Sequence, residues 1–426
     1  MPSIAVHTQV FVRVARSTSR LRGFPTLRNC FVPQPVVDRT PEQLRAYIEG
    51  IDPVSGQPFM QGVIEGLLRP LEGADLTGET FERTTPRLLE PDTEENLRKL
   101  FEDNRWTDFL PIVLPTEERV AAMLKGTSQP ADRIVGRMRA GNFREAWEYT
   151  VEKVAVSAVM AGARPEYFPV ILALAASNQT SRQGSTTSQT CMSIVNGPIR
   201  DEIGMNYGIG AMGPYNHANA TIGRAYSLIS QHGQGGSVPG ETYMGTLGNP
   251  FAWSLVYAEN EEASPWEPLH VSKGMKRDES AVSVFVGNRY MHEGFGPRET
   301  WEEKFTRSLQ ASAYLPPCLV MDPLVAKLFA GKGITTKQEL IDWAAQHARL
   351  PAREYWDDQW MQTLIRPHGV AGVEPWATKL KAAPDEIVQM YEPDQINAVV
   401  TGGGTQGAWK IFGAKYVTTV SVDAWR

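Results

Sequence analysis

Short apolar segments typical of buried strands alternate along this chain with segments of helical periodicity. Strands are expected at residues 110–116, 281–286, 318–323, 396–400 and 416–422. Helices are expected from residues 41 and 117 onward, capped by Thr40 and Thr116, and from 164 onward. Further helices are expected over 91–103, where Thr93 opens the periodic stretch, and over 143–161, 218–231 and 408–412. This alternation favours an α/β fold with mainly parallel, helix-flanked sheets. The C-terminal half is expected to be Rossmann-like or flavodoxin-like, behind a helical N-terminal arm.

The length of the chain allows two or three structural units. With 426 residues and 42% hydrophobic content, it can bury a large core. We expect an N-terminal arm with a helical lead-in over residues 1–90 and a central, pocket-forming α/β region over 91–275. The remaining residues, 276–426, are expected to form a C-terminal α/β region.

Composition excludes several classes of partner. The formal charge of −6 leaves no basic field across the surface to neutralise a phosphate backbone, so nucleic acid is not expected. No apolar run approaches the ~18 residues that span a bilayer, so no membrane partner is expected. Cys30, Cys191 and Cys318 lie far apart, without a Cys-x-x-Cys pair, which suits a reducing, cytoplasmic location.

The first 37 residues carry five arginines and no acid. The arginines are Arg13, Arg16, Arg20, Arg22 and Arg28. Such a composition matches a transit peptide superficially, but the prolines and the β-type run over residues 5–12 fit that interpretation poorly. A basic arm packed on another subunit is the favoured interpretation, and it predicts a homo-oligomer.

A glycine-rich turn follows the strand expected at 396–400. Gly402, Gly404 and Gly407 formally satisfy G-x-G-x-x-G, and Asp423 comes 21 residues after Gly402, as in a dinucleotide-binding fingerprint. A turn that lines a pocket for another small molecule explains the same residues. In either case Gly402, Gly404, Gln406 and Asp423 are candidate binding residues.

A second glycine set runs into the helix expected at 218–231. Gly208, Gly210 and Gly213 precede Tyr215, Asn216 and His217, so exposed N–H groups and a helix dipole would meet a titratable ring. The alternative is a packed turn with a satisfied histidine. Further polar candidates surround this loop, namely Asn196, Arg200, Asp201 and Arg224.

Three more features of the central region each allow a structural or a functional interpretation. Residues 231–243 are too glycine-rich for regular structure and form either a mobile lid or a surface loop, with Glu241 as the candidate base. Cys191 is a nucleophile only if His217 or Arg200 lowers its pKa, and a core position is favoured. The acidic run at 259–262 is expected to be a solvated face.

The C-terminal residues resemble a known family. Thr401-Gly402-Gly403-Gly404-Thr405-Gln406-Gly407-Ala408-Trp409, followed by Ser421-Val422-Asp423, is similar to the UGSC-type (seleno)proteins. In that family a T-G-x-G turn and a U-G-S-C redox motif precede a helix and another strand. The resemblance covers most of residues 90–426 and implies an oxidoreductase scaffold. Gln406 and Trp409 stand near the family's redox positions, and neither can exchange thiols.

The leading functional hypothesis is a cofactor-independent acid/base enzyme, a lyase, hydratase or hydrolase acting on a small polar or anionic molecule. Arg200 and the 208–213 loop would hold the anion, and His217 would transfer the proton. Tyr215, Asn216 and Gln406 would orient the substrate, with Glu241 or Asp201 as partner acid. No metal-ligand spacing such as H-E-x-x-H occurs, so no metal or cofactor is expected, although dispersed ligands stay open. The alternatives are an oxidoreductase and a non-catalytic binding or scaffold subunit.

Overall fold

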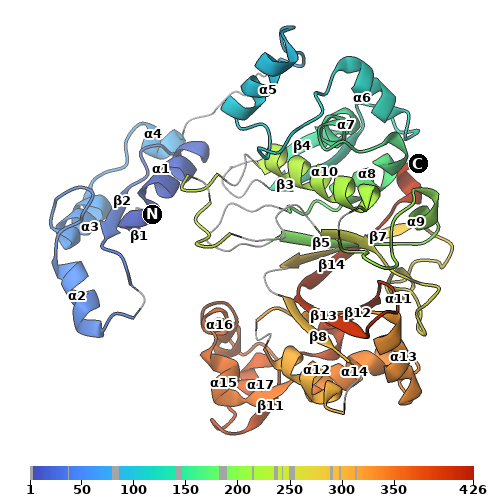
Figure 1. The fold of residues 1–426 in the computed structure, drawn as a ribbon. Helices are drawn as coiled ribbons and strands as arrows, with labels where there is room; N and C mark the ends of the chain where they lie inside the picture. Colours follow the sequence, from blue (N-terminus) through green and yellow to red (C-terminus); the bar gives the residue numbers. More distant parts are fainter. Residues whose placement is uncertain are drawn as a thin grey trace.

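The structure is a computed structural model in which two β-sheets pack face to face between two outer layers of helices (Figure 1). An N-terminal module stands to one side of this layered body. The structure describes residues 3–36, 38–78, 86–139, 146–181, 190–213, 215–234, 238–241, 243–248, 255–287, 291–296, 299–311 and 314–426.

The first sheet has four strands in the order β14-β7-β5-β6. These strands are β5 (Thr190–Asn196), β6 (Leu255–Ala258), β7 (Ala281–Gly287) and β14 (Lys415–Ser421). β5 and β6 are parallel, whereas β7 runs antiparallel to both β5 and β14. Strands from the central and the C-terminal regions of the sequence therefore share this sheet.

The second sheet repeats this arrangement in the order β12-β9-β13-β8. Its strands are β8 (Met291–Phe295), β9 (Pro317–Met321), β12 (Asn397–Val400) and β13 (Ala408–Gly413). β9 and β12 are parallel, and β13 runs antiparallel to β9 and β8. Each sheet thus has one parallel pair followed by two antiparallel neighbours.

Hydrogen bonds beyond the strand ends follow the same pattern in both sheets. The residue after β6 donates to β5, from Glu259 N to Val195 O at 3.2 Å, and the residue after β12 donates to β9, from Thr401 N to Met321 O at 3.0 Å. The two sheets are therefore related as pseudo-equivalent halves. Each half passes its fourth strand to the other, because β8 follows β7 into the second sheet and β14 follows β13 into the first.

Apolar side chains from both sheets fill the space between them. Met192 and Phe285 from the first sheet belong to the same buried cluster as Cys318, Val399 and Phe412 from the second. Two further clusters lie between each sheet and its helices. This layering places the carboxyl end of β6 beside the carboxyl end of β12.

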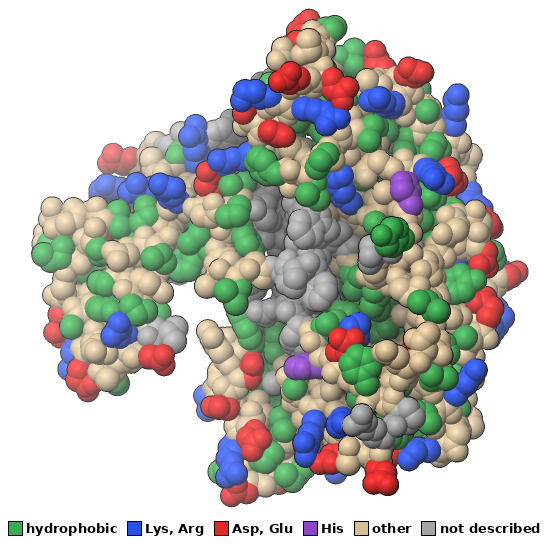
Figure 2. Space-filling model, in the orientation of Figure 1, with side chains coloured by type: hydrophobic (Ala, Val, Ile, Leu, Met, Phe, Trp, Pro, Cys, Tyr) green, Lys and Arg blue, Asp and Glu red, His purple; other side chains and the backbone are tan. Residues whose placement is uncertain are grey.

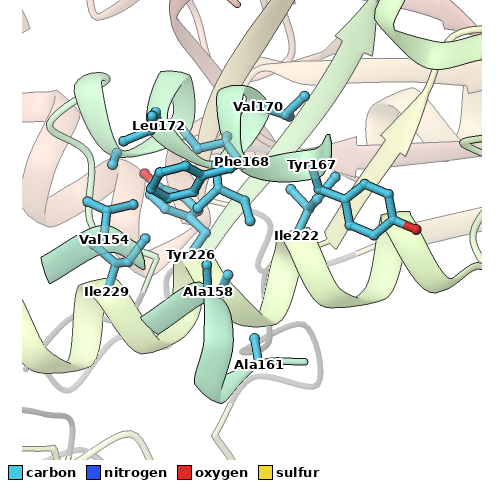
Figure 3. Packing of buried hydrophobic residues seen from close by; sticks show 14 of the residues in the cluster. Val154, Ala158, Ala161, Tyr167, Phe168, Val170, Leu172, Ile222, Tyr226 and Ile229 are labelled. Carbon is cyan, nitrogen blue, oxygen red and sulfur yellow. The ribbon is translucent and has the colours of Figure 1, made fainter. Parts of the chain in front are cut away.

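Helices cover the outer face of each sheet. The first sheet is covered by α8 (Phe168–Ala176) and α10 (His217–Gln234), and α7 (Val151–Met160) packs against both helices. Figure 3 shows their packing, in which Val154, Phe168 and Ile229 point into one cluster. The second sheet is covered by α12 (Trp301–Gln310), α13 (Pro323–Gly331) and α14 (Lys337–His347).

The remaining elements complete the body. They are α5 (Glu94–Asp103), α6 (Glu117–Leu124), β3 (Ile134–Arg139), β4 (Ala146–Thr150), η2 (Pro165–Tyr167), α9 (Ile199–Glu202), α11 (Leu269–Ser272), β10 (Arg349–Pro351), α15 (Ala352–Asp357), η3 (Met361–Ile365), α16 (Arg366–Val370), α17 (Trp376–Lys379), β11 (Ile387–Gln389), η4 (Pro393–Gln395) and η5 (Asp423–Trp425). β3 pairs with β4, and β10 with β11, as antiparallel hairpins.

The N-terminal module combines a small parallel sheet with four α-helices. Its elements are β1 (Ala5–Thr8), η1 (Gln9–Phe11), α1 (Val12–Leu21), β2 (Asn29–Val32), α2 (Pro41–Glu49), α3 (Phe59–Leu68) and α4 (Ala74–Thr77). Buried Arg28 joins its parts by donating to the carbonyls of Gly66, Arg69 and Pro70 and pairing with Asp75 at 3.1 Å.

Local sequence signals account for several helix starts. Thr40, Thr93 and Thr116 each accept a hydrogen bond from a backbone N–H in the first turn of α2, α5 and α6, as the sequence predicts. The four strands expected in the C-terminal region are also present, as β7, β9, β12 and β14. The general α/β class is confirmed.

Other expectations are corrected. Residues 110–116 form no strand, and the helix expected from 143 begins at Val151, after strand β4. Residues 408–412 lie in β13 rather than in a helix, because they pair with β9 and β8 on either side. The two large sheets are mixed rather than mainly parallel. Within the described residues, none of the helices combines the length and the apolar composition that crossing a membrane requires.

Candidate functional site

The two glycine loops that the sequence separates by nearly 200 residues meet in the structure. Gly402 N donates to Tyr207 O at 2.8 Å. A Cβ added to Gly403 would lie 2.3 Å from Ile209 Cγ1 and 3.1 Å from its backbone nitrogen, so only glycine permits this approach. We name residues 206–213 and 401–406 together the glycine-loop face.

The ends of two parallel strands hold this face in place. Asn260, just after β6, donates from its backbone N to Val400 O at 2.8 Å and from Nδ2 to Gly402 O at 3.1 Å. Thr401 Oγ1 donates back to Ala258 O at 2.7 Å. The face therefore lies at the carboxyl ends of β6 and β12, where α/β proteins commonly bind ligands.

His217 begins α10 directly after the first glycine loop. Its side chain is exposed, and its Nδ1 lies 3.3 Å from the hydroxyl of Tyr167. Tyr167 is itself 3% exposed, and Figure 3 shows its hydroxyl directed away from the apolar cluster that holds its ring. The imidazole is thus oriented through Nδ1 at the positive end of an 18-residue helix.

The two residues before His217 differ sharply. Tyr215 is fully exposed and has a φ of +68°, an uncommon conformation for a side chain of its size. Asn216 is buried, and its Nδ2 donates to the carbonyls of Gly210 and Gly213 at 2.7 and 3.0 Å. Asn216 therefore holds the loop from inside, and its amide group is engaged there.

Arg200 is buried in internal ion pairs. Its guanidinium lies 3.2 Å from Glu261 and 2.8 Å from Glu262, and it also donates to the backbone carbonyl of Glu259. With its donors turned to the protein's own oxygens, Arg200 acts as a structural anchor and not as a free anion-binding group. The proposed role of Arg200 in holding the substrate is corrected on this ground.

A buried polar network lies beside Arg200. Glu259 is fully buried and pairs with Lys337 at 3.0 Å, at the start of α14. Asn196 Nδ2 donates to Glu259 at 2.7 Å, while the buried Asn196 Oδ1 has no hydrogen-bond partner among the described residues. The expectation of a solvated acidic face at 259–262 is therefore wrong for buried Glu259 and for Glu261, whose side chain is 8% exposed, whereas the side chain of Glu262 is 59% exposed.

Sequence reasoning missed Glu259 and Lys337. A carboxylate directly after the apolar strand β6 was the available signal, because a strand end next to a sheet core restricts exposure. Lys337 gave no signal of its own, since it sits one residue after a Thr336 cap and resembles any exposed residue of a helix's first turn.

Three other charged candidates are paired away from the face. Arg224 contacts Asp108 at 2.9 Å, and Glu241 contacts Arg105 at 2.8 Å. Asp423 accepts from Ser280 N at 2.8 Å and from Arg426. Gly235, Gly236, Ser237 and Thr242 of the expected lid lie outside the described residues.

Asp201 is exposed and accepts a hydrogen bond of 2.6 Å from the hydroxyl of Tyr207. This hydrogen bond, with partial burial and the charge of Asp201, raises the pKa of Tyr207 to about 12. The Arg200 guanidinium lies 4.8 Å from the Tyr207 ring centre. Asp201 therefore helps to hold Tyr207, whose backbone carbonyl accepts the hydrogen bond from Gly402 N.

The second loop lacks the geometry of a dinucleotide fingerprint. Gln406 and Gly404 are exposed, but the chain after them enters β13 instead of a helix. Without a helix N-terminus behind the glycines, the pyrophosphate would lose its expected dipole and N–H donors. The dinucleotide interpretation of Gly402–Gly407 and Asp423 is corrected for this reason.

The thiols are not poised as nucleophiles. Cys191 and Cys318 are fully buried, and burial raises the pKa of each thiol to about 12. Burial also raises the pKa of Cys30. Cys191 lies in the apolar cluster between the first sheet and its helices, the position that its apolar neighbours favour.

A cavity of about 440 Å³ lies elsewhere, between α12 and α14. It is lined by Glu302, Glu303, Thr306, Arg307, Gln310, Trp343 and His347, none of them a predicted site residue. We give more weight to the glycine-loop face, because the cavity's charged groups pair with each other or with Lys332. Among the residues that the structure describes, no three His, Cys, Asp or Glu side chains lie together as a metal site.

Comparison of the chain with protein-family models, with curated proteins and with solved structures found no match.

Proposed function

We propose that this protein is an acid/base enzyme that acts on a small anionic or polar molecule bound at the glycine-loop face. The convergence of residues 206–213 with residues 401–406, next to a histidine oriented by Tyr167, carries the proposal. Two loops from distant parts of a sequence rarely need glycine at their contact unless close backbone approach matters.

His217 is the proton-transfer group in this proposal. Its Nδ1 is held by Tyr167, which leaves Nε2 for a substrate. The first turn of α10 and the backbone of residues 208–213 would seat an anion, and Gln406 and Tyr215 are exposed polar groups able to orient it. The reaction class stays that of a lyase, hydratase or hydrolase without a cofactor, in the cytoplasm.

The non-catalytic binding subunit is the second candidate, and one observation favours it. Arg200, Arg224, Glu241 and Asp423 all engage the protein's own groups, so the face keeps few free charges. A face of this kind can bind a ligand without turning it over.

The family and the finer fold type stay predictions. The resemblance to UGSC-type proteins is supported by the strand and T-G-x-G turn at residues 397–404, but the strand β13 after the turn departs from the helix that the resemblance implies. A Rossmann-like or flavodoxin-like relationship of the C-terminal half is likewise a proposal. The proposed role of His217 depends on neither the family resemblance nor the finer fold type.

The test uses inorganic phosphate and a panel of small mono- and dicarboxylates as probes. NMR spectra of the histidine rings should show His217, assigned with His217→Gln, shifting on addition of at least one probe. Turnover of the same panel, followed by NMR, should be lost in His217→Gln and kept in His347→Gln, a matched change of another exposed histidine.

The outcomes separate the candidates. Probe binding with turnover that depends on His217 supports the enzyme, and Tyr167→Phe should then lower the rate by about 10-fold through loss of orientation. Binding at the face without turnover of any compound supports the binding subunit. A His217 signal that no probe perturbs contradicts both proposals.

A further inference from the structure

Helix α3 of the N-terminal module packs Phe59 and two glycines inward and turns four large apolar residues outward. A Cβ on Gly62 would lie 3.2 Å from Cys30 Sγ in β2, and one on Gly66 would lie 2.4 Å from Cδ1 of Ile4, the residue before β1. The two glycines therefore allow the helix to approach these segments closely. Phe59 is the only residue of α3 that is fully buried. The inner face of α3 is therefore made by Phe59, the two glycines and half-buried Val63.

The outer face of α3 is apolar and exposed. Met60, Ile64, Leu67 and Leu68 are 43%, 50%, 39% and 76% exposed, and their spacing of four, three and one residues places them along one stripe. Two neighbours extend it, Ile48 on α2 and Ile51, which bridges to Pro58 just before α3. Figure 2 shows hydrophobic side chains gathered over this module. We call these six residues the α3 patch.

The patch is large enough to be the apolar part of an interface. Its six side chains together expose about as much surface as three fully exposed residues, on the order of 500 Å². A stable interface buries about 800 Å² per partner, of which somewhat more than half is apolar. A contiguous apolar patch of this size on a protein surface usually marks a binding surface.

Charge indicates what covers it. Residues 1–37 carry five arginines and no acid, whereas residues 38–78 carry seven acids and three arginines. Arg28 and Asp75 pair with each other and Asp52 is buried, which leaves an excess of four positive charges in the first segment and two negative charges in the second. Arg13, Arg16 and Arg20 are exposed on α1, and Glu42 and Glu49 are exposed on α2. Two copies related by a two-fold axis can place the basic half of each module against the acidic half of the other.

We propose that the N-terminal module binds the same module of a second copy, with the α3 patch at the two-fold axis and the two charged halves opposed. A second copy can pair both signs of charge, whereas an anionic lipid surface would attract only the arginines and leave Glu42 and Glu49 unpaired. The inference is independent of the function proposed for the glycine-loop face.

The test is sedimentation velocity of the full chain between 1 and about 50 μM at low salt. We expect a dimer for the wild type, and a weakening of about 100-fold for the double variant Ile64→Glu and Leu68→Glu, because two charges would be buried at the interface. Val370→Glu is the matched control, since Val370 is 72% exposed on α16, and it should dimerise like the wild type. Circular dichroism would check that each variant is folded.

Charge reversal tests the orientation. Changing Arg13, Arg16 and Arg20 to Glu should weaken the dimer, and adding Glu42→Arg and Glu49→Arg should restore it at least in part. A monomeric wild type at 50 μM, or a dimer that the α3 variants leave intact, would overturn the proposal. A monomer that co-sediments with vesicles of anionic lipid would also overturn it and identify a lipid partner instead.

Discussion

The two pseudo-equivalent halves of the body share one strand order, yet their carboxyl edges differ in chemistry. In the first half, Glu259 follows β6 and is buried in a charged network with Lys337. In the second half, the equivalent residue after β12 is Thr401, followed by three glycines. One edge is filled by ion pairs, and the other is kept free of side chains so that a loop from the first half can approach.

The residues at the ends of the central strands differ in the same sense. Asn196 ends β5 and joins the charged network, whereas Asp322 follows β9, caps α13 through Val325 N and accepts from Ala408 N at 2.9 Å. The same topology thus supports a buried charged network at one edge and a glycine loop at the other. Activity is expected at the glycine loop of the second half, and the buried charged network of the first half is expected to contribute to stability.

The largest expected effect comes from breaking the buried pair. Lys337→Met should lower the free energy of unfolding by about 3–5 kcal/mol, because Glu259 would stay buried without its partner charge. Urea unfolding at pH 7 measures this effect. The combined Glu259→Gln and Lys337→Met variant should recover much of the loss, and Lys99→Met, which removes an exposed pair, should cost about 0.5 kcal/mol or less. Equal losses for Lys337→Met and Lys99→Met would show that the network is not buried.

The cap of the second half should have the next largest effect. Asp322→Ala removes the α13 cap and leaves Ala408 N without its side-chain acceptor, so we expect a loss of about 2 kcal/mol in the free energy of unfolding. Asp385→Ala, at an exposed pair with Arg353, is the control and should stay close to the wild type. If Asp322→Ala also unfolds like the wild type, the second edge does not depend on its aspartate.

The contact between the two glycine loops gives a smaller effect. Gly403→Ala should cost about 1–3 kcal/mol in urea unfolding, because its Cβ would overlap Ile209. Ile209→Ala in the same chain should relieve part of this cost. Gly331→Ala is the control, since nothing lies within 4 Å of its added Cβ and it ends a helix, so it should be neutral or slightly stabilising. If Gly403→Ala unfolds like the wild type, the two loops do not make this close contact, and the proposed site loses support.

The smallest effect concerns Tyr207, which links the two halves because its backbone carbonyl accepts from Gly402 N. Asp201→Asn should lower the Tyr207 pKa from about 12 toward its ordinary value near 10, because the hydrogen bond to a charged acceptor is lost. Since the pKa is raised in the folded state, its contribution to stability is present below pH 10 and is lost as the pH rises toward 12. Tyrosinate absorbance near 295 nm, compared with Tyr207→Phe, measures it. An unchanged titration would mean that Asp201 does not receive the Tyr207 hydroxyl in solution.

Local patterns predicted much of the fold, and long-range pairing caused the errors. Threonine caps located α2, α5 and α6, because the cap depends on residues only three apart. Residues 408–412 were expected to be helical after a glycine turn, but pairing with β9 and β8 on both sides made them a strand. The partner strands β8 and β9 lie far away in the sequence, so the residues around 408–412 do not reveal this pairing.

The site was predictable to a similar extent. Glycine content indicated both loops, since close backbone approach requires it, but their mutual contact depends on the packing of the two sheets. Arg200, Arg224 and Glu241 were reasonable candidates by residue type, and the structure pairs each with a charge from a distant segment. A charged side chain's partner decides its role, and the partner cannot be read from its own neighbours.

The exchange of fourth strands between the halves has a consequence for how the chain folds. β7 ends at Gly287, while its outer neighbour β14 begins only at Lys415, so the edge of β7 stays uncovered while the second half is being synthesised and folded. Such distant pairing slows folding and leaves a strand edge open to other chains in the meantime. The second sheet has all four of its strands once β13 is made, whereas the first sheet waits for β14. A chain halted before Lys415 would therefore leave the edge of β7 exposed for a chaperone to shield.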